Sequence, residues 1–241
     1  SAKTWKFLKE FQQQTGTKAT IFHLVIWAGA KVIQDNPHLN RFISGKRIYQ
    51  RRGMYMSFSA KKEMTENSPI VAIKRKIEPH WDFETLVKNI SGTVREGKSD
   101  NKSHTDIELS LLFKFPRFIV SFFAYIIMKL DHFGLMPGFM IRNDPLFASV
   151  FIANLGSIGL GTAYHHLFEY GTIPLFITIG KQENQPFINA KNEIVVQPGV
   201  SLKYSFDERI ADGFYCLRAL KQLEKIIKDP YQFISLTPET R

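Results

Sequence analysis

Cysteine is almost absent from this chain, since Cys216 is the single one among 241 residues. One cysteine cannot form an intramolecular disulfide, which excludes a disulfide-stapled scaffold and favours a reducing compartment. Cys216 lies in the apolar run FYCLRAL, for which we predict a helix with the thiol packed in the core. No Cys/His cluster has metal-ligand spacing, and no glycine-rich stretch matches a phosphate- or dinucleotide-binding loop. We therefore expect no metal site.

Apolar runs long enough to cross a bilayer are also lacking. The longest charge-free one, Phe118–Met128, would span about 16 Å as a helix, against about 30 Å for a bilayer core. We interpret it as a buried or oligomer-facing helix. The alternative is contact with a membrane surface through Phe118, Phe122 and Ile126. We accordingly expect a cytoplasmic protein, free or peripheral to a membrane.

Acidic residues are outnumbered, with 32 Lys and Arg against 22 Asp and Glu and a net charge of +10. A solvated basic rim is the simplest interpretation. The alternatives are an anionic membrane surface, a phosphorylated cofactor such as coenzyme A, and an acidic protein partner. No nucleic acid is expected, because no recognised binding motif accompanies the charge. The basic residues cluster at Lys46-Arg47, Arg51-Arg52, Lys61-Lys62 and Lys74-Arg75-Lys76.

What the chain does have is core-forming material: it is 44% hydrophobic and only 22% charged, which predicts a folded domain with a sizeable core. His23 lies in an apolar helical run and is expected to be a packed core histidine. The polar run GKSDNKSHTD is the best candidate for a linker or exposed loop. Helical spacing is found over residues 4–16, 20–37, 82–97 and 211–229. Strand patterns cover 41–52, with a turn at Gly45-Lys46, and 54–60, 69–77, 149–161, 173–181 and 185–207, with a turn near Lys191-Asn192.

Four segments, in this order, carry a resemblance to a known family: NPHLNRFISGKRIYQR, FIANLGSIG, IPLFITIGK and LKYSFDERIADGFY. Together they resemble the catalytic domain of the dihydrolipoyl acyltransferases of 2-oxoacid dehydrogenase complexes, which shares the fold of chloramphenicol acetyltransferase. The resemblance runs from Thr17 to the last helix, except over residues 99–145. It implies one α/β domain over residues 1–241, with a mixed sheet, flanking helices and a divergent apolar helical insertion at 99–145.

The resemblance also implies an activity. Members of the family move an acyl group between coenzyme A and the thiol of a lipoyl group. A histidine removes the thiol proton, and a serine or threonine hydroxyl stabilises the oxyanion. The site lies between subunits of a trimer, so a homotrimer with coenzyme A as substrate is implied. The motif's Asp-Gly pair mainly sets the geometry of a turn and is kept here as Asp212-Gly213.

Two departures from the motif concern its reactive groups. Glu208 stands where the family keeps its histidine, and carboxylates ordinarily titrate about four units below a thiol, too low for a good base. Ala153 stands where the family keeps the serine of its Ser-Asn pair. The candidates to bind the oxyanion and the substrate are Asn154 and, in the following turn, Ser157 beside Gly156.

A second source of the base is the pair His165-His166. On an extended strand neighbouring side chains point to opposite faces, so only one of the two would face the site. Three interpretations of this pair are open. One histidine is packed and the other exposed without a catalytic role, or one of them is a relocated base, or the pair contributes to trimer contacts or to the shape of the acyl-binding site. Arg209 and Asp207 flank the altered position, where an ion pair with Glu208 or a neighbouring subunit competes with a role in substrate binding or catalysis.

Two function classes follow from these observations. The first is a coenzyme A-dependent acyltransferase-like protein that works with a rearranged site built on Glu208, the two histidines, Asn154 and Asp212. The second is a catalytically inactive trimeric scaffold that docks on a partner or a membrane. A peripheral membrane protein without acyl chemistry is a third interpretation. No lipoyl or subunit-binding domain precedes the matched region in this chain, so an ordinary dehydrogenase core subunit is not expected.

Overall fold

The computed structural model describes residues 1–61, 70–98, 115–189 and 191–236. The helices are α1 (Ala2–Thr15), α2 (Ile21–Asp35), α3 (Phe83–Lys98), α5 (Arg117–His132), α6 (Gly138–Asn143) and α7 (Gly213–Lys228). The strands are β1 (Arg41–Ser44), β2 (Arg47–Gln50), β3 (Met54–Lys61), β4 (Ile70–Ile77), β5 (Val150–Asn154), β6 (Leu175–Ile188) and β7 (Ile194–Phe206). Short 3-10 turns are η1 (Pro37–Asn40), η2 (Leu155–Ile158) and η3 (Pro230–Gln232).

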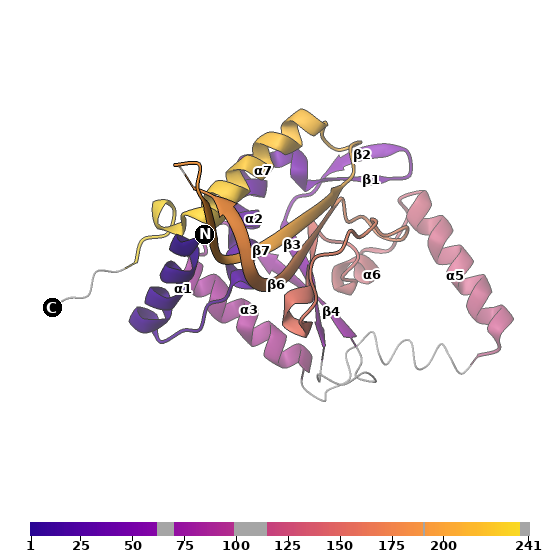
Figure 1. Cartoon of the computed structure of the whole chain (residues 1–241). Helices are drawn as coiled ribbons and strands as arrows, with labels where there is room; N and C mark the ends of the chain where they lie inside the picture. Colours follow the sequence, from indigo (N-terminus) through magenta and orange to yellow (C-terminus); the bar gives the residue numbers. More distant parts are fainter. Residues whose placement is uncertain (62–69, 99–114, 190, 237–241) are drawn as a thin grey trace.

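A mixed five-stranded sheet in the order β4-β3-β5-β6-β7 forms the centre of the molecule (Figure 1). The inner strands β3, β5 and β6 run parallel, whereas β4 and β7 pair antiparallel at the two edges. The register places Asn154 beside Ile179 and Leu175 beside Phe206. Strands β1 and β2 form a separate hairpin. The prediction of a mixed α/β sheet is confirmed.

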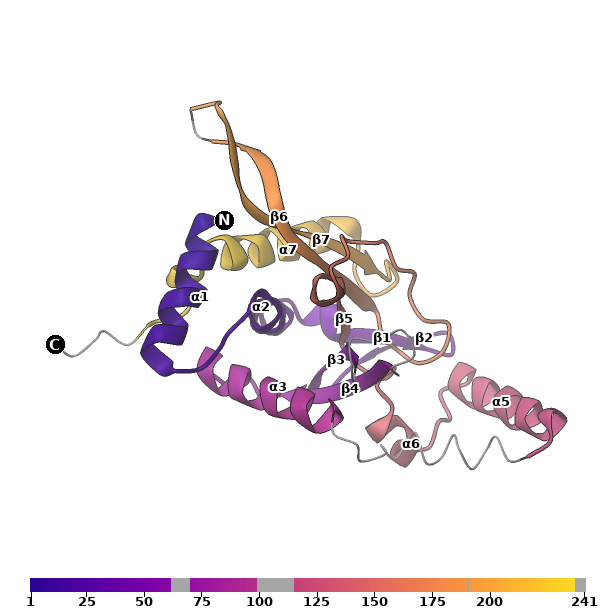
Figure 2. The same ribbon diagram turned by 60° about the horizontal axis from the view of Figure 1, so that its bottom comes forward.

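The core divides between the two faces of the sheet. Helices α1, α2, α3 and α7 cover one face, and α2 lies between α3 and α7 (Figure 2). Because residues alternate along β5, Ile152 points into this large core, while Phe151 and Ala153 point into a smaller cluster on the opposite face. Helix α2 is buried nearly all round, as its continuous apolar sequence predicts.

Local signals in the sequence fix most element ends. Helix α1 ends at Gly16, whose φ of 66° lies in the left-handed region. Asp82 caps α3 by accepting a hydrogen bond from the Thr85 amide at 2.7 Å. The last hairpin turns at Asn192, with a φ of 60°. The expected stop at Gly97 is wrong, because the described part of α3 continues to Lys98. The polar run at 97–106 lies largely outside the described residues.

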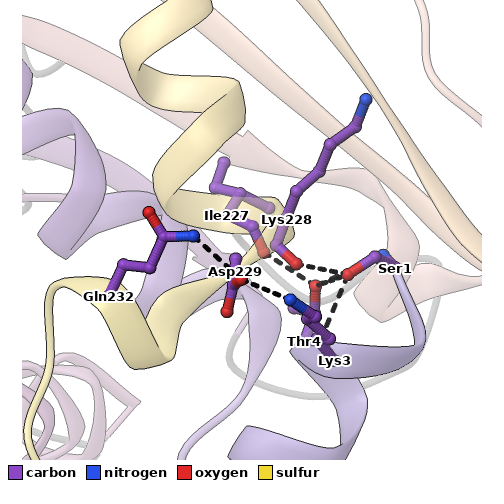
Figure 3. A network of polar contacts seen from close by, with 7 residues as sticks. All are labelled: Ser1, Lys3, Thr4, Ile227, Lys228, Asp229 and Gln232. Carbon is purple, nitrogen blue, oxygen red and sulfur yellow. Dashed lines mark hydrogen bonds and ion pairs between the residues drawn. The ribbon is translucent and has the colours of Figure 1, made fainter.

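The N-terminal helix is tied to the C-terminal one at their ends (Figure 3). Buried Thr4 donates its hydroxyl to the Ile227 carbonyl at 2.7 Å, and Ser1 donates to the Lys228 carbonyl. Lys3 pairs with Asp229, but Lys3 is mostly exposed, so solvent screens the pair and it adds little to the stability of the fold. The buried hydroxyl bond is therefore the main polar link that joins α1 to α7 in one layer.

His23 is a packed core histidine, as predicted. Its Nδ1 accepts a hydrogen bond from the Thr20 amide at 3.2 Å, so the ring proton lies on Nε2, which donates to Ser91 Oγ at 3.1 Å. Both ring nitrogens are thus satisfied in the neutral form. Burial lowers the pKa of His23 to about 4.

This lowered pKa predicts a loss of stability in acid. His23 binds its proton in the unfolded chain near pH 6.5 but in the folded protein only near pH 4. The contribution of neutral His23 to the free energy of unfolding is therefore fully present above pH 6.5. It falls by about 3 kcal/mol as the pH drops from 6.5 to 4. Urea unfolding of the wild type and of His23→Gln, each at pH 7 and at pH 4, measures this loss of stability. Equal pH dependence in the two proteins would contradict the assignment.

Helix α5 stands apart from the layered body (Figures 1 and 2), and none of its residues is buried. Phe118 is 74% exposed and Phe122 is 61% exposed, while Ile126 is half-buried. The expectation of a helix buried within the chain is therefore wrong for the described residues, although the last turn of α5 reaches the β1–β2 hairpin, where Ser44 donates a weak hydrogen bond to the Asp131 carbonyl. The alternative of an oligomer-facing helix stays a prediction. Among the described residues, no helix is long and apolar enough to span a bilayer.

Candidate functional site

The turn after β7 keeps a rigid local structure. The Asp207 amide donates to the Pro174 carbonyl at 2.9 Å, which holds the turn against the start of β6. Arg209 binds the Asp207 carboxylate through two nitrogens, at 2.8 Å and 2.6 Å. Burial opposes ionisation of Asp207, but the hydrogen bonds from Arg209 outweigh it and lower the pKa of the carboxyl below its ordinary value. Arg209 therefore pairs with Asp207 and not with Glu208, one of the alternatives considered for it, while a contact with a neighbouring subunit and a role in substrate binding or catalysis stay predictions.

The Asp-Gly pair of the turn has a structural role. Asp212 is the N-cap of α7 and accepts a hydrogen bond from the Tyr215 amide at 2.8 Å, and the helix begins at Gly213. A carboxylate at this position satisfies one of the free amides of the first turn and interacts favourably with the helix dipole. The predicted contribution of Asp212 to catalysis stays a prediction.

Glu208 projects from the same turn and is exposed to solvent. Within the described parts of the chain it forms no hydrogen bond and no ion pair. Cys216, in the first turn of α7, is buried in the core, and burial raises the pKa of its thiol, so the prediction of core packing is confirmed.

The second half of the candidate site is the turn after β5. Ala153 is buried in the smaller cluster, and Asn154 ends the strand half-buried. Ser157 donates its hydroxyl to the Asn154 carbonyl at 2.7 Å. Gly156 lies so close to β6 that a Cβ there would approach the Gly180 carbonyl oxygen to 2.5 Å. The structure thus gives Gly156 a packing role that the sequence pattern did not reveal.

The two histidines lie outside any strand, so the expectation that they point to opposite faces is wrong. Residues 161–168 have no regular structure and are held across β6 and β7 by hydroxyl groups, with Ser205 donating to the His165 carbonyl. The two rings lie on the same side, with centroids 5.1 Å apart. His165 is half-buried and stacks on Phe176 at 3.9 Å, whereas His166 is exposed.

Hydrogen bonding indicates the tautomer of His166. Its Nδ1 lies 2.8 Å from the Leu167 carbonyl oxygen, and a carbonyl can only accept, so Nδ1 carries the proton. The exposed Nε2 is then left with a free lone pair. His166 can therefore accept a proton from solvent-side groups without changing its contact to the backbone.

The fold separates the two halves of the candidate site within one chain. Asn154 lies beside Ile179, while Glu208 follows Phe206, which pairs with Leu175 at the other end of the same stretch of β6. Strand geometry places the two about 20 Å apart. His165 stacks on Phe176, which lies between these two levels of β6. The loop that follows the histidines contributes Leu167 and Phe168 to the same pocket as Asp207 and Arg209.

A polar pocket of about 180 Å³ lies beside the turn and includes Asp207 and Arg209. Sequence patterns did not indicate its other ionisable residues, Asp131, His132 and Glu169, because they come from the end of α5 and from a loop, both distant from this turn in the sequence. Asp131 accepts a hydrogen bond from the Gly171 amide at 3.1 Å, and burial raises the pKa of its carboxyl. Among the described residues, no group of three or more His, Cys, Asp and Glu could hold a metal ion.

The chain is similar to known proteins in sequence and in fold. Residues 146–235 match the family model described as 2-oxoacid dehydrogenases acyltransferase (catalytic domain). A curated relative, the dihydrolipoyllysine-residue acetyltransferase component of the acetoin cleaving system of Bacillus subtilis, is 22% identical over 223 residues. That match covers 92% of this chain and 45% of the relative, so the chain spans about half the length of the protein it matches.

Solved structures show the same fold at low identity. A dihydrolipoamide acetyltransferase of Azotobacter vinelandii, studied for the catalytic roles of a serine, a histidine and an asparagine, has a TM-score of 0.63 at 16% identity, covering 93% of this chain and 74% of its own. The cubic core of a pyruvate dehydrogenase complex has a TM-score of 0.62 at 16% identity, covering 94% and 76%. Chloramphenicol acetyltransferase has a TM-score of 0.50 at 13% identity, covering 91% and 82%. The chain therefore has the chloramphenicol acetyltransferase-like fold seen in the catalytic domains of 2-oxoacid dehydrogenase acyltransferases.

Proposed function

We propose that this chain is a coenzyme A-dependent acyltransferase that works with a rearranged site. The observation that carries the proposal is the turn after β7. The Asp207–Arg209 pair and the Asp212 cap hold its shape. By the sequence resemblance, Glu208 in this turn corresponds to the position of the family's histidine, and this correspondence is part of the proposal. Coenzyme A enters as a substrate, and no resident metal is part of the proposal. The single buried Cys216 suits the cytoplasmic location that we propose with it.

His166 is the proposed base, because its Nε2 lone pair is free and exposed. In the forward step Nε2 takes the proton of the acceptor thiol, and the thiolate attacks the carbonyl carbon of the acyl-coenzyme A thioester. The tetrahedral intermediate collapses by breaking the bond to the coenzyme A sulfur. That thiolate then recovers the proton from the imidazolium, so charge and protons balance.

Asn154 is the proposed donor to the oxyanion. Within the described residues its side-chain amide forms no hydrogen bond, whereas the Ser157 hydroxyl already donates to a backbone carbonyl. A free amide at the end of a rigid strand is suited to stabilise a developing negative charge. Asn154→Ala tests this role, with Ser157→Ala as its matched control.

A second copy of the chain is needed to complete such a site. Glu208 and Asn154 lie about 20 Å apart in one chain, at opposite ends of the β6 register. A head-to-tail contact that joins unlike surfaces closes into a ring when the rotation allows it. The fold relative forms a cubic core, and cubic symmetry always contains threefold axes. We therefore propose a homotrimer, which sedimentation equilibrium tests as three times 27.8 kDa.

The second candidate is a trimeric scaffold without turnover. It is favoured by the missing hydroxyl at Ala153, the unburied carboxylate at Glu208, and the exposed apolar helix α5. A scaffold would form the trimer but release no thiol from acyl-coenzyme A. Contact of Phe118 and Phe122 with a membrane stays a prediction, and co-sedimentation with anionic vesicles tests it, with Phe122→Asp expected to weaken binding at least tenfold.

A further inference from the structure

Arg51 is a largely buried cation without an acidic partner. It follows β2, and its Nη2 donates to the Thr172 carbonyl at 3.1 Å and to the Thr172 hydroxyl at 3.0 Å. Nη1 makes only a long contact, at 3.5 Å, with the Phe147 carbonyl, and buried Nε has no hydrogen-bond partner among the described residues. No carboxylate of these residues lies within ion-pair distance of it. Burial lowers the pKa of Arg51 to about 10, which still leaves the guanidinium charged at neutral pH.

A second basic side chain adds to the positive charge of this region. Lys74 donates from Nζ to the carbonyls of Ile141 at 2.8 Å and Asp144 at 3.3 Å. Burial, and then the charge of Arg51, lower the pKa of Lys74 to about 8. The Asp144 carboxylate is already engaged, because it accepts from the Tyr170 hydroxyl at 2.7 Å and from the Leu146 amide at 2.8 Å. The expectation that the basic clusters form a solvated rim is therefore wrong at these two positions.

Arg51 also lines a pocket of about 190 Å³ formed by the β1–β2 hairpin, the region around α6, and the loop before β6. Most of the wall is apolar, which is unusual around an unpaired guanidinium. The Ser44 and Thr172 side chains bring hydroxyl groups to the same pocket. The apolar side chains of its lining are Phe42, Tyr49, Met136, Ile141 and Phe147.

We propose that this pocket binds a monocarboxylate with a short apolar tail, with Arg51 pairing to the carboxylate and the tail lying against the aromatic and aliphatic wall. Such a ligand offsets the two costs of the empty arrangement, since it pairs a desolvated cation and removes apolar surface from water. The pocket lining does not include the turn that carries Glu208, but Ser44 and Thr172 also line the neighbouring pocket that contains Asp207 and Arg209. The proposed site does not depend on acyl transfer, because binding is measured without turnover.

The competing explanation is that Arg51 only supports the fold. Its guanidinium lies 4.5 Å from the ring centroid of Phe42, and its bonds to Thr172 fasten the loop before β6. A structural role predicts that carboxylates have no effect on the wild type. Ligand selectivity is therefore measured first on the unaltered chain, and variants come second.

Calorimetry with acetate, hexanoate, hexylamine and inorganic phosphate separates the ligand classes. Hexanoate is expected to bind saturably and at least tenfold more tightly than acetate, because each buried methylene strengthens binding about fourfold. Hexylamine is expected not to bind, since its charge has the wrong sign, and phosphate is expected to bind more weakly than hexanoate. Equal binding of hexanoate and hexylamine, phosphate binding as tight as hexanoate, or no binding of any carboxylate would overturn the proposal.

The matched variants are Arg51→Gln and Arg52→Gln, since Arg52 is the exposed neighbour. The first is expected to weaken hexanoate binding at least tenfold and the second to leave it unchanged. Should Arg51→Gln fail to fold, methyl NMR of the wild type gives the answer. Hexanoate is expected to shift the Met136 methyl in the pocket and not the Met54 methyl in the main core. Binding that survives Arg51→Gln, or a silent Met136, would contradict the site.

Discussion

Replacing His166 with alanine is expected to reduce the rate of thiol release from acyl-coenzyme A a hundredfold or more. The reason is the loss of the free Nε2 lone pair that the Nδ1 bond to the Leu167 carbonyl leaves exposed. General bases typically contribute about a hundred- to ten-thousandfold. Affinity for acyl-coenzyme A should change little, because the base acts on the acceptor thiol. Initial rates at saturating substrate, with affinity from calorimetry, measure the two effects separately.

His165→Ala is the matched control for this experiment. The His165 ring stacks on Phe176 at 3.9 Å and is half-buried, so its loss is expected to lower the midpoint of urea unfolding. The rate per folded molecule should stay within about threefold of wild type. Unchanged turnover in His166→Ala would remove that residue as the base. An equal hundredfold loss of turnover in folded His165→Ala would contradict the proposal that His166, and not His165, is the base.

The second large effect is expected at Gly156, where alanine should destabilise the fold by about 2–4 kcal/mol. A Cβ at this position would lie 2.5 Å from the Gly180 carbonyl oxygen and 2.8 Å from its carbon, and both are backbone atoms of β6. Backbone cannot move aside as a flexible side chain can, so the turn after β5 must shift. Because Asn154 precedes this turn, acyl transfer should fall as well. Urea unfolding followed by circular dichroism measures the stability.

Gly161→Ala serves as the control in the same turn region. A Cβ there meets no atom within 4 Å, so the change is expected to alter stability by less than about 0.5 kcal/mol. Similar losses of stability in both variants would mean that the close approach of η2 to β6 does not explain the effect of Gly156→Ala. A stable Gly156→Ala with normal turnover would contradict the described geometry of the turn.

Much of the fold can be predicted from the sequence because its signals are local. Asp82 and Gly16 mark helix ends through capping and a left-handed turn, and the apolar run of α2 predicts burial on all sides. The terminal turn is also predictable, since the geometry of Asp212-Gly213 is set by the first turn of α7. Helix α5 was not predictable in the same way. Its apolar composition indicates only that something covers it, and no described part of the chain buries any of its residues.

The site is less predictable because its residues meet through contacts that no local pattern encodes. The side-by-side arrangement of the two histidine rings depends on Ser205, which lies 40 residues further along the chain. Charge composition could not distinguish exposed Arg52 from largely buried Arg51, because burial of the latter depends on the loop at Thr172. The sequence also did not determine the partner of Arg209, since Asp207 and Glu208 are both close to it in the chain and the structure pairs it with Asp207.

The measurement that tests the central claim most directly is calorimetry of the purified protein with acetyl- and long-chain acyl-coenzyme A, with release of free thiol followed in parallel. The account predicts saturable binding of at least one of the two and thiol release that depends on an acceptor thiol and on His166. Binding of neither ligand, with no thiol released by a correctly folded trimer, would contradict acyl transfer and leave the scaffold as the function of this fold.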